Sequence, residues 1–127
     1  MGKRIILVVE DDPVLRMLTC RQVAQLGYAC ETVSSGEEAL TRIQSNVGLI
    51  FMDIGLPGID GITATILIRK KEVTESARRI PIVALTAHSK HKQCIEAGMD
   101  DFVQKPALLT DIKGVLDRWF PNSDHDL

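Results

Sequence analysis

The feature of this sequence that most constrains its fold is a regular alternation of short apolar runs with longer amphipathic stretches. Residues 5–9 read Ile-Ile-Leu-Val-Val, residues 49–52 read Leu-Ile-Phe-Met, and residues 80–85 form a similar run. Uninterrupted runs of this length are typical of strands buried on both faces. Strands that alternate with helices indicate βαβ units, in which helices cover both faces of a parallel sheet.

The whole pattern predicts five strands and five helices in an α/β sandwich. Two weaker strands are expected at 28–33 and 102–103. Helices are expected from residue 13 to about 26, over a short segment after residue 35, and over 61–71 and 90–97. A last helix is expected over about 108–119.

Capping residues fix where several of these helices begin and end. Asp12 is a suitable N-cap with Pro13 in the first helical position, Ser35 and Glu38 form a capping box, and Gly27 is placed to end a helix. The apolar residues expected on the buried faces of the first, third and last helices are Leu15, Leu18, Val23, Leu26, Ile62, Ile66, Leu67, Leu108, Leu109, Ile112, Val115, Leu116 and Trp119.

The chain has 127 residues and a formal net charge of -2, a size that fits one domain. We expect this domain to span residues 1–121 and a flexible polar tail to span 122–127. The weak negative charge gives no footprint for nucleic acid. The basic clusters at residues 69–71 and 78–79 are interpreted as solvated surface.

Three widely spaced cysteines form neither a Cys-x-x-Cys pair nor a disulfide framework, which favours a reducing compartment. No apolar run approaches the ~20 residues that span a bilayer. No signal peptide precedes the first strand. We therefore expect a cytoplasmic domain with no direct membrane contact.

Polar side chains follow four of the predicted strands at the point where each strand ends. The sequence reads Glu10-Asp11-Asp12 after the first strand, Asp53 at the end of the third, Thr86-Ala87 after the fourth and Lys105-Pro106 after the fifth. Ligands of open parallel sheets bind beyond the carboxyl ends of the strands. A single Asp after a strand is usually a helix cap, but four polar strand ends together indicate one functional site.

Several carboxylates at one place repel one another, by about 4 kcal/mol per pair at ~4 Å and an effective dielectric constant of 20. Lys105 alone is too little to offset this repulsion. A divalent cation with oxygen ligands fits, and Mg²⁺ fits best because it is held by few carboxylates and keeps water and phosphate oxygens as further ligands. Beside such an ion a carboxylate can attack phosphorus, while a lysine and a hydroxyl stabilise the phosphoryl oxygens.

These segments together resemble the receiver domain of two-component response regulators. The resemblance rests on Val8-Val9-Glu10-Asp11-Asp12, the run from Met52 to Gly61, Ala84-Leu85-Thr86-Ala87 and Lys105-Pro106. These motifs occur in the order of the family and cover nearly the whole chain. The resemblance implies a flavodoxin-like, doubly wound sheet with strand order 2-1-3-4-5.

The resemblance also implies a role for each matching residue. Asp53 is the implied phosphoacceptor. The implied Mg²⁺ ligands are Asp11, Asp53, the backbone carbonyl of Gly55 and, through water, Glu10. The residues implied to stabilise the phosphoryl group are Lys105, Thr86 and Ala87. Thr86 and Phe102 form the implied conformational switch, and the bond before Pro106 is expected to be cis.

The implied function is phosphorelay signalling. Asp53 would accept a phosphoryl group from a phosphohistidine and pass the signal on through a change in conformation. The partners would be a sensor histidine kinase, a histidine-phosphotransfer domain or both. Residues 54–58 and 86–88 look most like receivers of hybrid sensor kinases, and a membrane-bound kinase would tether the domain. Val14 and Met17 are interpreted as core residues or, alternatively, as a face that binds a phosphotransfer helix.

Two departures from the family pattern modify these expectations. The stretch from His88 to Glu96 is a few residues shorter than usual, which implies an altered output face. Gly55 stands where relatives often carry a larger side chain, which implies that water reaches the acyl phosphate and shortens its lifetime. His88 and His91 are interpreted as solvated residues rather than as a metal-binding pair.

Other functions remain compatible with parts of the pattern. A receiver-like scaffold would act by protein–protein contact without phosphorylation. A Mg²⁺-dependent phosphatase of the haloacid dehalogenase type would need Asp-x-Asp, whereas Asp53 is followed by Ile54 and Gly55. A nucleotide- or flavin-binding module would need a phosphate-binding loop after the first strand, where the acidic run has the wrong charge. The complete polar set favours a self-phosphorylating signalling domain over an enzyme.

Overall fold

The computed structural model describes residues 4–43, 46–87 and 90–120. Within these ranges the strands are β1 (Ile5–Val9), β2 (Cys30–Val33), β3 (Val47–Asp53), β4 (Ile82–Thr86) and β5 (Asp101–Gln104). The helices are α1 (Pro13–Gln25), α2 (Gly36–Arg42), α3 (Gly61–Thr74), α4 (His91–Ala97) and α5 (Leu109–Trp119). All strand pairs are parallel, in the order β2-β1-β3-β4-β5. The predicted fold is confirmed.

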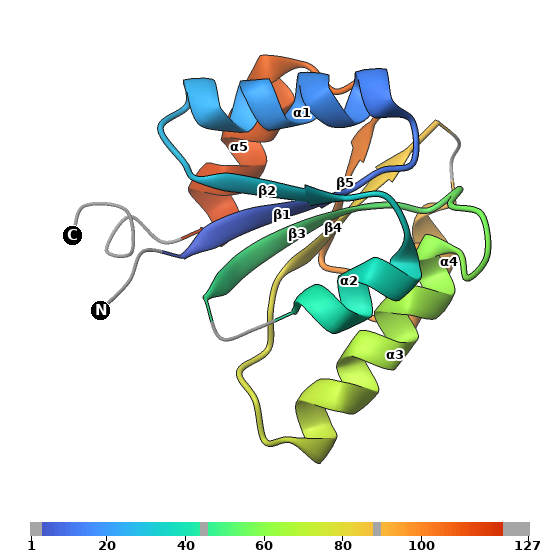
Figure 1. Ribbon diagram of the computed structural model, residues 1–127. Helices are drawn as coiled ribbons and strands as arrows, with labels where there is room; N and C mark the ends of the chain where they lie inside the picture. Colours follow the sequence, from blue (N-terminus) through green and yellow to red (C-terminus); the bar gives the residue numbers. More distant parts are fainter. Residues whose placement is uncertain (1–3, 44–45, 88–89, 121–127) are drawn as a thin grey trace.

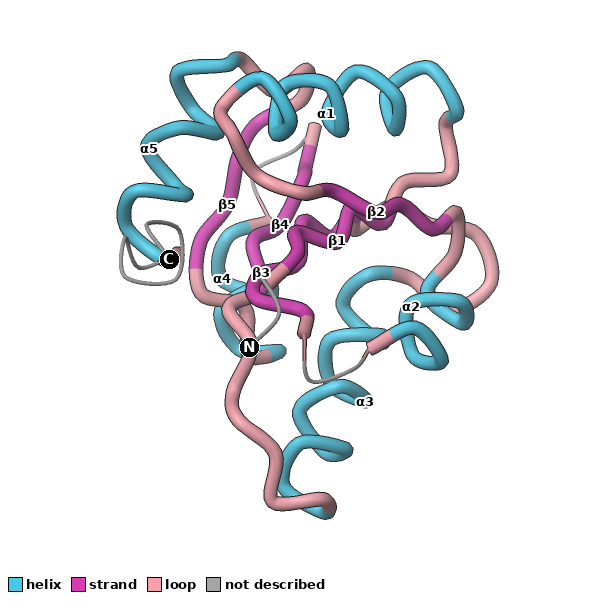
Figure 2. Tube along the Cα trace, turned by 60° about the vertical axis from the view of Figure 1, so that its left-hand side comes forward, coloured by secondary structure: helices cyan, strands magenta, loops and turns pink. Residues whose placement is uncertain are grey.

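The sheet separates two layers of helices, with α1 and α5 on one face and α2, α3 and α4 on the other (Figures 1 and 2). Alternate residues of β1 serve the two cores: Ile6 and Val8 pack with α1 and α5, while Leu7 packs with α2, α3 and α4. Burial of each such side chain contributes about 1.5–3 kcal/mol. A strand that is buried on both faces explains the unbroken apolar run in the sequence.

The predicted helix caps are present. The Asp12 carboxylate accepts hydrogen bonds from the backbone N–H groups of Val14 at 2.9 Å and Leu15 at 3.2 Å. Pro13 fills the first helical position of α1. The Ser35 hydroxyl likewise accepts from the N–H of Glu38 at 3.0 Å and caps α2. These contacts satisfy amide groups that a helix N-terminus leaves without partners.

Four apolar residues predicted to face the core are instead exposed, so these predictions are wrong: Leu18, Ile66, Leu67 and Leu108. Helix α1 buries Thr19 and Val23, and Leu108 precedes α5 as its cap rather than lying in it. Hydrophobicity alone misassigned these helix faces because smaller or polar residues occupy the buried positions.

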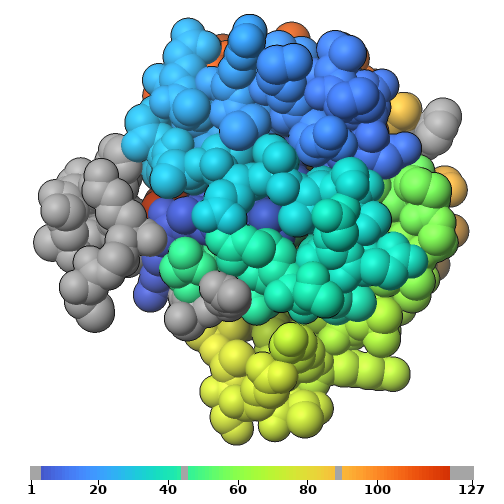
Figure 3. Space-filling view, viewed as in Figure 1, coloured from blue at the N-terminus to red at the C-terminus, as the bar shows by residue number. Residues whose placement is uncertain are grey.

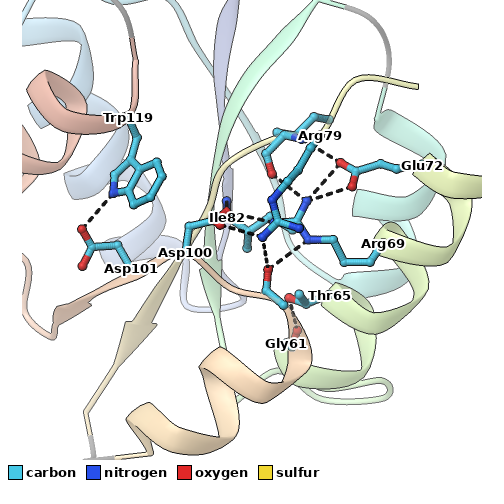
Figure 4. A network of polar contacts seen from close by, with 11 residues as sticks. Gly61, Thr65, Arg69, Glu72, Arg79, Ile82, Asp100, Asp101 and Trp119 are labelled. Atoms are coloured by element: carbon cyan, nitrogen blue, oxygen red, sulfur yellow. Dashed lines mark hydrogen bonds and ion pairs between the residues drawn. The ribbon is translucent and has the colours of Figure 1, made fainter. Parts of the chain in front are cut away.

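Helix α3 shows why its buried face is not its most apolar one. It buries Ala64, Thr65, Ile68 and Glu72. The Thr65 hydroxyl donates to the carbonyl of Gly61 at 2.8 Å, so its burial leaves no unpaired polar group (Figure 4). Small residues at 61 and 64 let the helix lie close to the sheet, which leaves the larger Ile66 and Leu67 outside.

A polar network fastens α3 to the amino ends of β4 and β5 (Figure 4). The Arg69 guanidinium contacts Glu72 Oε1 and Asp100 Oδ2, each at 2.9 Å. It also donates to the carbonyl oxygens of Gly98 at 2.9 Å and Ile80 at 2.8 Å. Its side chain is only 13% exposed. The prediction that residues 69–71 are simply solvated is therefore wrong for Arg69.

The acids of this network are fully engaged as well. Glu72 accepts a hydrogen bond from the N–H of Ile80 at 2.8 Å. Asp100 accepts from the N–H of Ile82 at 2.9 Å and pairs with Arg79 at 2.6 Å. Two carboxylates thus face two guanidinium groups, and the cluster is electrically balanced.

Among the described helices, none has both the length and the apolar character that crossing a bilayer requires. The predicted tail at residues 122–127 and His88 lie outside the described residues.

Candidate functional site

The polar residues at the strand ends come together at the carboxyl edge of the sheet. Because β1, β3 and β4 are neighbours, their ends surround one hollow of about 350 Å³. Its lining consists of Glu10, Asp11, Asp12, Leu15, Asp53, Ile54, Gly55, Thr86, Ala87, Lys90 and Lys105. The seven residues implied to bind Mg²⁺ or to stabilise the phosphoryl group therefore share one site, together with the helix cap Asp12, while Phe102 and Pro106 are not part of its lining.

Three carboxylates form the centre of this hollow. Glu10, Asp11 and Asp53 each offer an oxygen, and these oxygens all lie within 4.8 Å of one another. Glu10 is 1% and Asp53 4% exposed, whereas Asp11 is exposed. The buried strands thus hold two of the acids away from water, where an uncompensated charge is unfavourable.

Lys105 forms ion pairs with two of these acids. Its Nζ lies 2.9 Å from Glu10 Oε1 and 3.0 Å from Asp53 Oδ1. Burial alone would lower the pKa of Lys105, but the hydrogen bonds to both carboxylates outweigh it and raise the pKa. Burial raises the pKa of Glu10, and the hydrogen bonds from Lys105 and from the Asp12 amide offset this only in part.

Backbone contacts fix the positions of the acids. The N–H of Asp12 donates to Glu10 Oε2 at 3.1 Å, and the N–H of Gly55 donates to Asp53 Oδ1 at 3.0 Å. From α1, the Arg16 guanidinium donates to the carbonyl oxygen of Glu10 at 3.0 Å. Arg16 is therefore a positioning residue, which the sequence pattern did not reveal.

Two glycines flank the Asp53 turn with opposite requirements. A β-carbon at Gly61 would lie 2.3 Å from the carbonyl oxygen of Asp53, so only glycine fits there. At Gly55 the nearest atom, Asp53 Oδ1, would be 3.7 Å away, an ordinary contact distance. Glycine is thus sterically required at 61, whereas position 55 has room for a side chain beside the carboxylate.

The arrangement fits a magnesium ion. Three carboxylates face one half-buried lysine, and their oxygen atoms are the hard ligands that Mg²⁺ prefers. No histidine or cysteine lies among the described residues that line the hollow, so the donor set does not suit zinc. A divalent cation would relieve the like-charge repulsion that Lys105 leaves.

The predicted switch residues lie on β4 and β5. Thr86 is buried at the end of β4, and its carbonyl accepts a hydrogen bond from the N–H of Lys105 at 2.9 Å. The bond between Lys105 and Pro106 is cis. Phe102 is half-buried and stacks on the His91 ring, with centroids 3.5 Å apart and planes at 10°. His91 is thus exposed but not fully solvated, because Phe102 covers one face of its ring.

The outer face of α1 exposes an apolar patch beside the site. Val14 is 67% and Met17 52% exposed, so the interpretation of these residues as core is wrong. In Figure 3 the outer surface of α1 (blue, top) is open to the surroundings. The patch is available for contact with a partner.

Lys90 is a second residue that the sequence reading missed. It lines the hollow although it precedes a helix rather than ending a strand. The only available signal was its position four residues after Thr86, in the segment that leads from the site into α4.

Comparison with known proteins agrees with this geometry. The family model for the response regulator receiver domain matches residues 6–117. The hybrid signal transduction protein dokA of Dictyostelium discoideum is 35% identical over 124 residues, which cover 97% of this chain. They cover only 7% of dokA, so this chain spans a small part of that relative.

Two solved structures are similar over nearly the whole chain. The receiver domain of the sensor histidine kinase PA1611 of Pseudomonas aeruginosa PAO1, with a magnesium ion coordinated in its active-site cleft, is 35% identical. It has a TM-score of 0.79, over 93% of this chain and 98% of that one. The receiver domain of Ssk1 in complex with the phosphotransfer protein Ypd1 (Saccharomyces cerevisiae) matches at 27% identity. Its TM-score is 0.82, over 94% of this chain and 90% of that one.

Proposed function

Because this chain belongs to the family of response regulator receiver domains, we propose that it accepts a phosphoryl group on Asp53 with the help of Mg²⁺. The observation that carries the proposal is the unbalanced charge of three carboxylates gathered around one lysine. Receiver domains are signalling modules rather than enzymes with a separate substrate. The complete set of polar strand ends supports phosphorylation over a purely structural scaffold.

Asp11, Asp53, the backbone carbonyl of Gly55 and, through water, Glu10 would hold the ion. When bound, Mg²⁺ supplies positive charge to the phosphoryl oxygens and lowers the repulsion met by an anionic donor. The PA1611 receiver domain carries magnesium in its cleft, which supports the same ligand chemistry here.

In the proposed reaction the Asp53 carboxylate attacks the phosphorus of a phosphohistidine. A new O–P bond forms while the P–N bond breaks, and the electron pair returns to the imidazole nitrogen of the donor. Lys105 orients Asp53 in the resting state through its contact at 3.0 Å and then pairs with a phosphoryl oxygen. The Thr86 hydroxyl and the Ala87 backbone N–H would donate to the remaining oxygens.

The same chemistry supplies the switch. A phosphoryl group on Asp53 adds charge and new acceptor oxygens at the site. Movement of Thr86 towards it would vacate space beside β5, which Phe102 would fill. Because Phe102 stacks on His91, this movement would also release α4. Because Gly55 places no side chain beside the acyl phosphate, we expect water to reach it and the phosphoaspartate to be short-lived.

The decisive experiment is incubation with acetyl phosphate and Mg²⁺, followed by intact mass spectrometry. Wild type should gain one phosphoryl group, and Asp53→Asn or chelator should abolish the gain. A protein that stays unmodified while it remains folded and binds Mg²⁺ would contradict the proposal and favour the scaffold function.

For the partner, we propose a histidine-phosphotransfer domain that docks on α1, within a relay fed by a sensor histidine kinase. The apolar patch formed by Val14 and Met17 lies next to the acidic turn, so a helix seated there could present its histidine to Asp53. The complex of Ypd1 with the Ssk1 receiver is a precedent for such a partner.

The docking proposal is tested by phosphotransfer to Ypd1 as a probe. Val14→Asp and Met17→Asp should slow transfer at least tenfold without changing the melting temperature, since these side chains touch little of the core. Val73→Asp on α3, where the side chain is 81% exposed, is the matched control and should transfer normally. Equal losses in all three variants would argue against a site on α1.

A further inference from the structure

Lys90 differs from Lys105 in how its charge is used. Lys105 is held by two carboxylates. Lys90 lines the same hollow, is exposed and has no ion-pair partner among the described residues. Its backbone is fixed, because its carbonyl accepts the N–H of Cys94 in α4 at 3.0 Å. Lys90 is therefore a cation without an ion-pair partner among the described residues, at the rim of an acidic site.

The charges of the lining residues show what this cation could compensate. Four acids line the hollow together with Lys90 and Lys105. With Mg²⁺ bound, these charges balance. Transfer of a phosphoryl group converts the singly charged Asp53 carboxylate into a dianionic acyl phosphate, so the site acquires one excess negative charge. Without Lys90 the excess would be twice as large.

We propose that Lys90 is the second cation of this site: it attracts the anionic phosphoryl donor and stabilises phosphorylated Asp53. This inference rests on the proposed function and adds a residue to it. With acetyl phosphate, the Asp53 oxygen bonds to phosphorus, the P–O bond to acetate breaks, and acetate leaves with the electron pair. Lys90 takes no part in bond making; its charge offsets that of the incoming donor.

The role predicts effects of opposite sign on two ligands. Removal of a positive charge from the rim favours binding of the cation Mg²⁺ and disfavours binding of an anionic phosphoryl donor or its analogue. In Lys90→Ala, Mg²⁺ should bind more tightly, whereas phosphorylation by acetyl phosphate and binding of beryllofluoride with Mg²⁺ should weaken. Each change should be about twofold to fivefold, the size expected of one screened charge several Å away. A merely structural role would weaken both ligands together.

The experiment measures Mg²⁺ affinity by calorimetry, beryllofluoride affinity by fluorine NMR at saturating Mg²⁺ and the phosphorylation rate by intact mass. Lys92 is the control, because it lies about 200° further round α4, is exposed, and does not line the hollow. Lys92→Ala should change none of the three quantities. Lys90→Arg should restore wild-type behaviour, and 0.5 M salt should shrink the Lys90→Ala effect as the Debye length falls to about 4 Å.

Three results would overturn the inference: no change in Lys90→Ala, losses of the same sign for both ligands, or an equal effect in Lys92→Ala. These outcomes are distinct from failure of the proposed function. In that case wild type itself would bind no Mg²⁺ or would gain no phosphoryl group.

Discussion

The two edges of the sheet carry charge clusters of similar size and opposite character. At the amino edge, Glu72 and Asp100 face Arg69 and Arg79, and each acid also accepts a backbone N–H. At the carboxyl edge, three carboxylates lie together and the half-buried Lys105 pairs with two of them, Glu10 and Asp53. Each cluster contains buried acids, but only the charges of the first are balanced.

Charge balance distinguishes a functional cluster from a structural one. A balanced, fully hydrogen-bonded network holds elements together and has no use for a ligand. An unbalanced cluster lowers the stability of the ligand-free fold, and the fold regains this stability when a cation binds. The two clusters should therefore respond to charge removal with opposite signs.

The largest expected effect is at the amino edge. Arg69→Met leaves Glu72 and Asp100 without their shared partner and should lower the free energy of unfolding by about 3 kcal/mol. Urea denaturation in chelator measures it, and Mg²⁺ affinity should stay unchanged. Arg79→Met, which removes a side chain that is 57% exposed, should lose under ~1 kcal/mol. Similar losses in both variants would refute the central role of Arg69.

Mg²⁺ should stabilise the fold through the cluster at the carboxyl edge alone. Mg²⁺ at ten times its dissociation constant should stabilise wild type by about 1.4 kcal/mol, because the ion binds only the folded chain. Calorimetric melting should show the same gain in Arg69→Met and none in Asp11→Asn. A gain that survives in Asp11→Asn would place the ion elsewhere.

Asp53→Asn should stabilise the metal-free protein by about 1 kcal/mol, since it removes one of three mutually repelling charges. The amide oxygen can keep the hydrogen bond from Gly55, so packing is retained. Denaturation in chelator tests the sign. A loss of stability would mean that this cluster, like the one at the amino edge, is already balanced without a metal.

The smallest effect is a pH dependence of the free energy of unfolding, measured in chelator. Burial raises the pKa of Glu10 above its usual 4.5, so this group contributes stability below pH 4.5 that is lost as pH rises through the folded-state pKa. The difference in unfolding free energy between wild type and Glu10→Gln should thus fall with rising pH and then level off. A difference that is constant or grows with pH would contradict the shift.

Sequence reasoning recovered the fold and most of the site because both are encoded locally. Buried strands read as unbroken apolar runs, and Glu10, Asp53 and Thr86 end such runs directly. Caps such as Asp12 act on amides two or three residues away, so their partners are visible in the sequence too.

What escaped prediction depends on contacts between distant segments. In the sequence, Arg69 looks like a surface cation, because its partner Asp100 lies on a different segment and only the fold brings the two together. In the sequence, Leu67 looks like a core residue, but α3 approaches the sheet at Gly61 and Leu67 therefore faces outward. Lys90 follows a strand end by several residues, and only the folded chain brings it to the hollow.

The glycine at position 61 also couples the position of α3 to that of Asp53. No side chain lies between the first turn of α3 and the carbonyl of Asp53, so nothing there can deform to absorb a displacement. The first turn of α3 and the end of β3 are in direct backbone contact. A tilt of α3 would therefore push on the backbone of Asp53 and shift its reactive carboxylate.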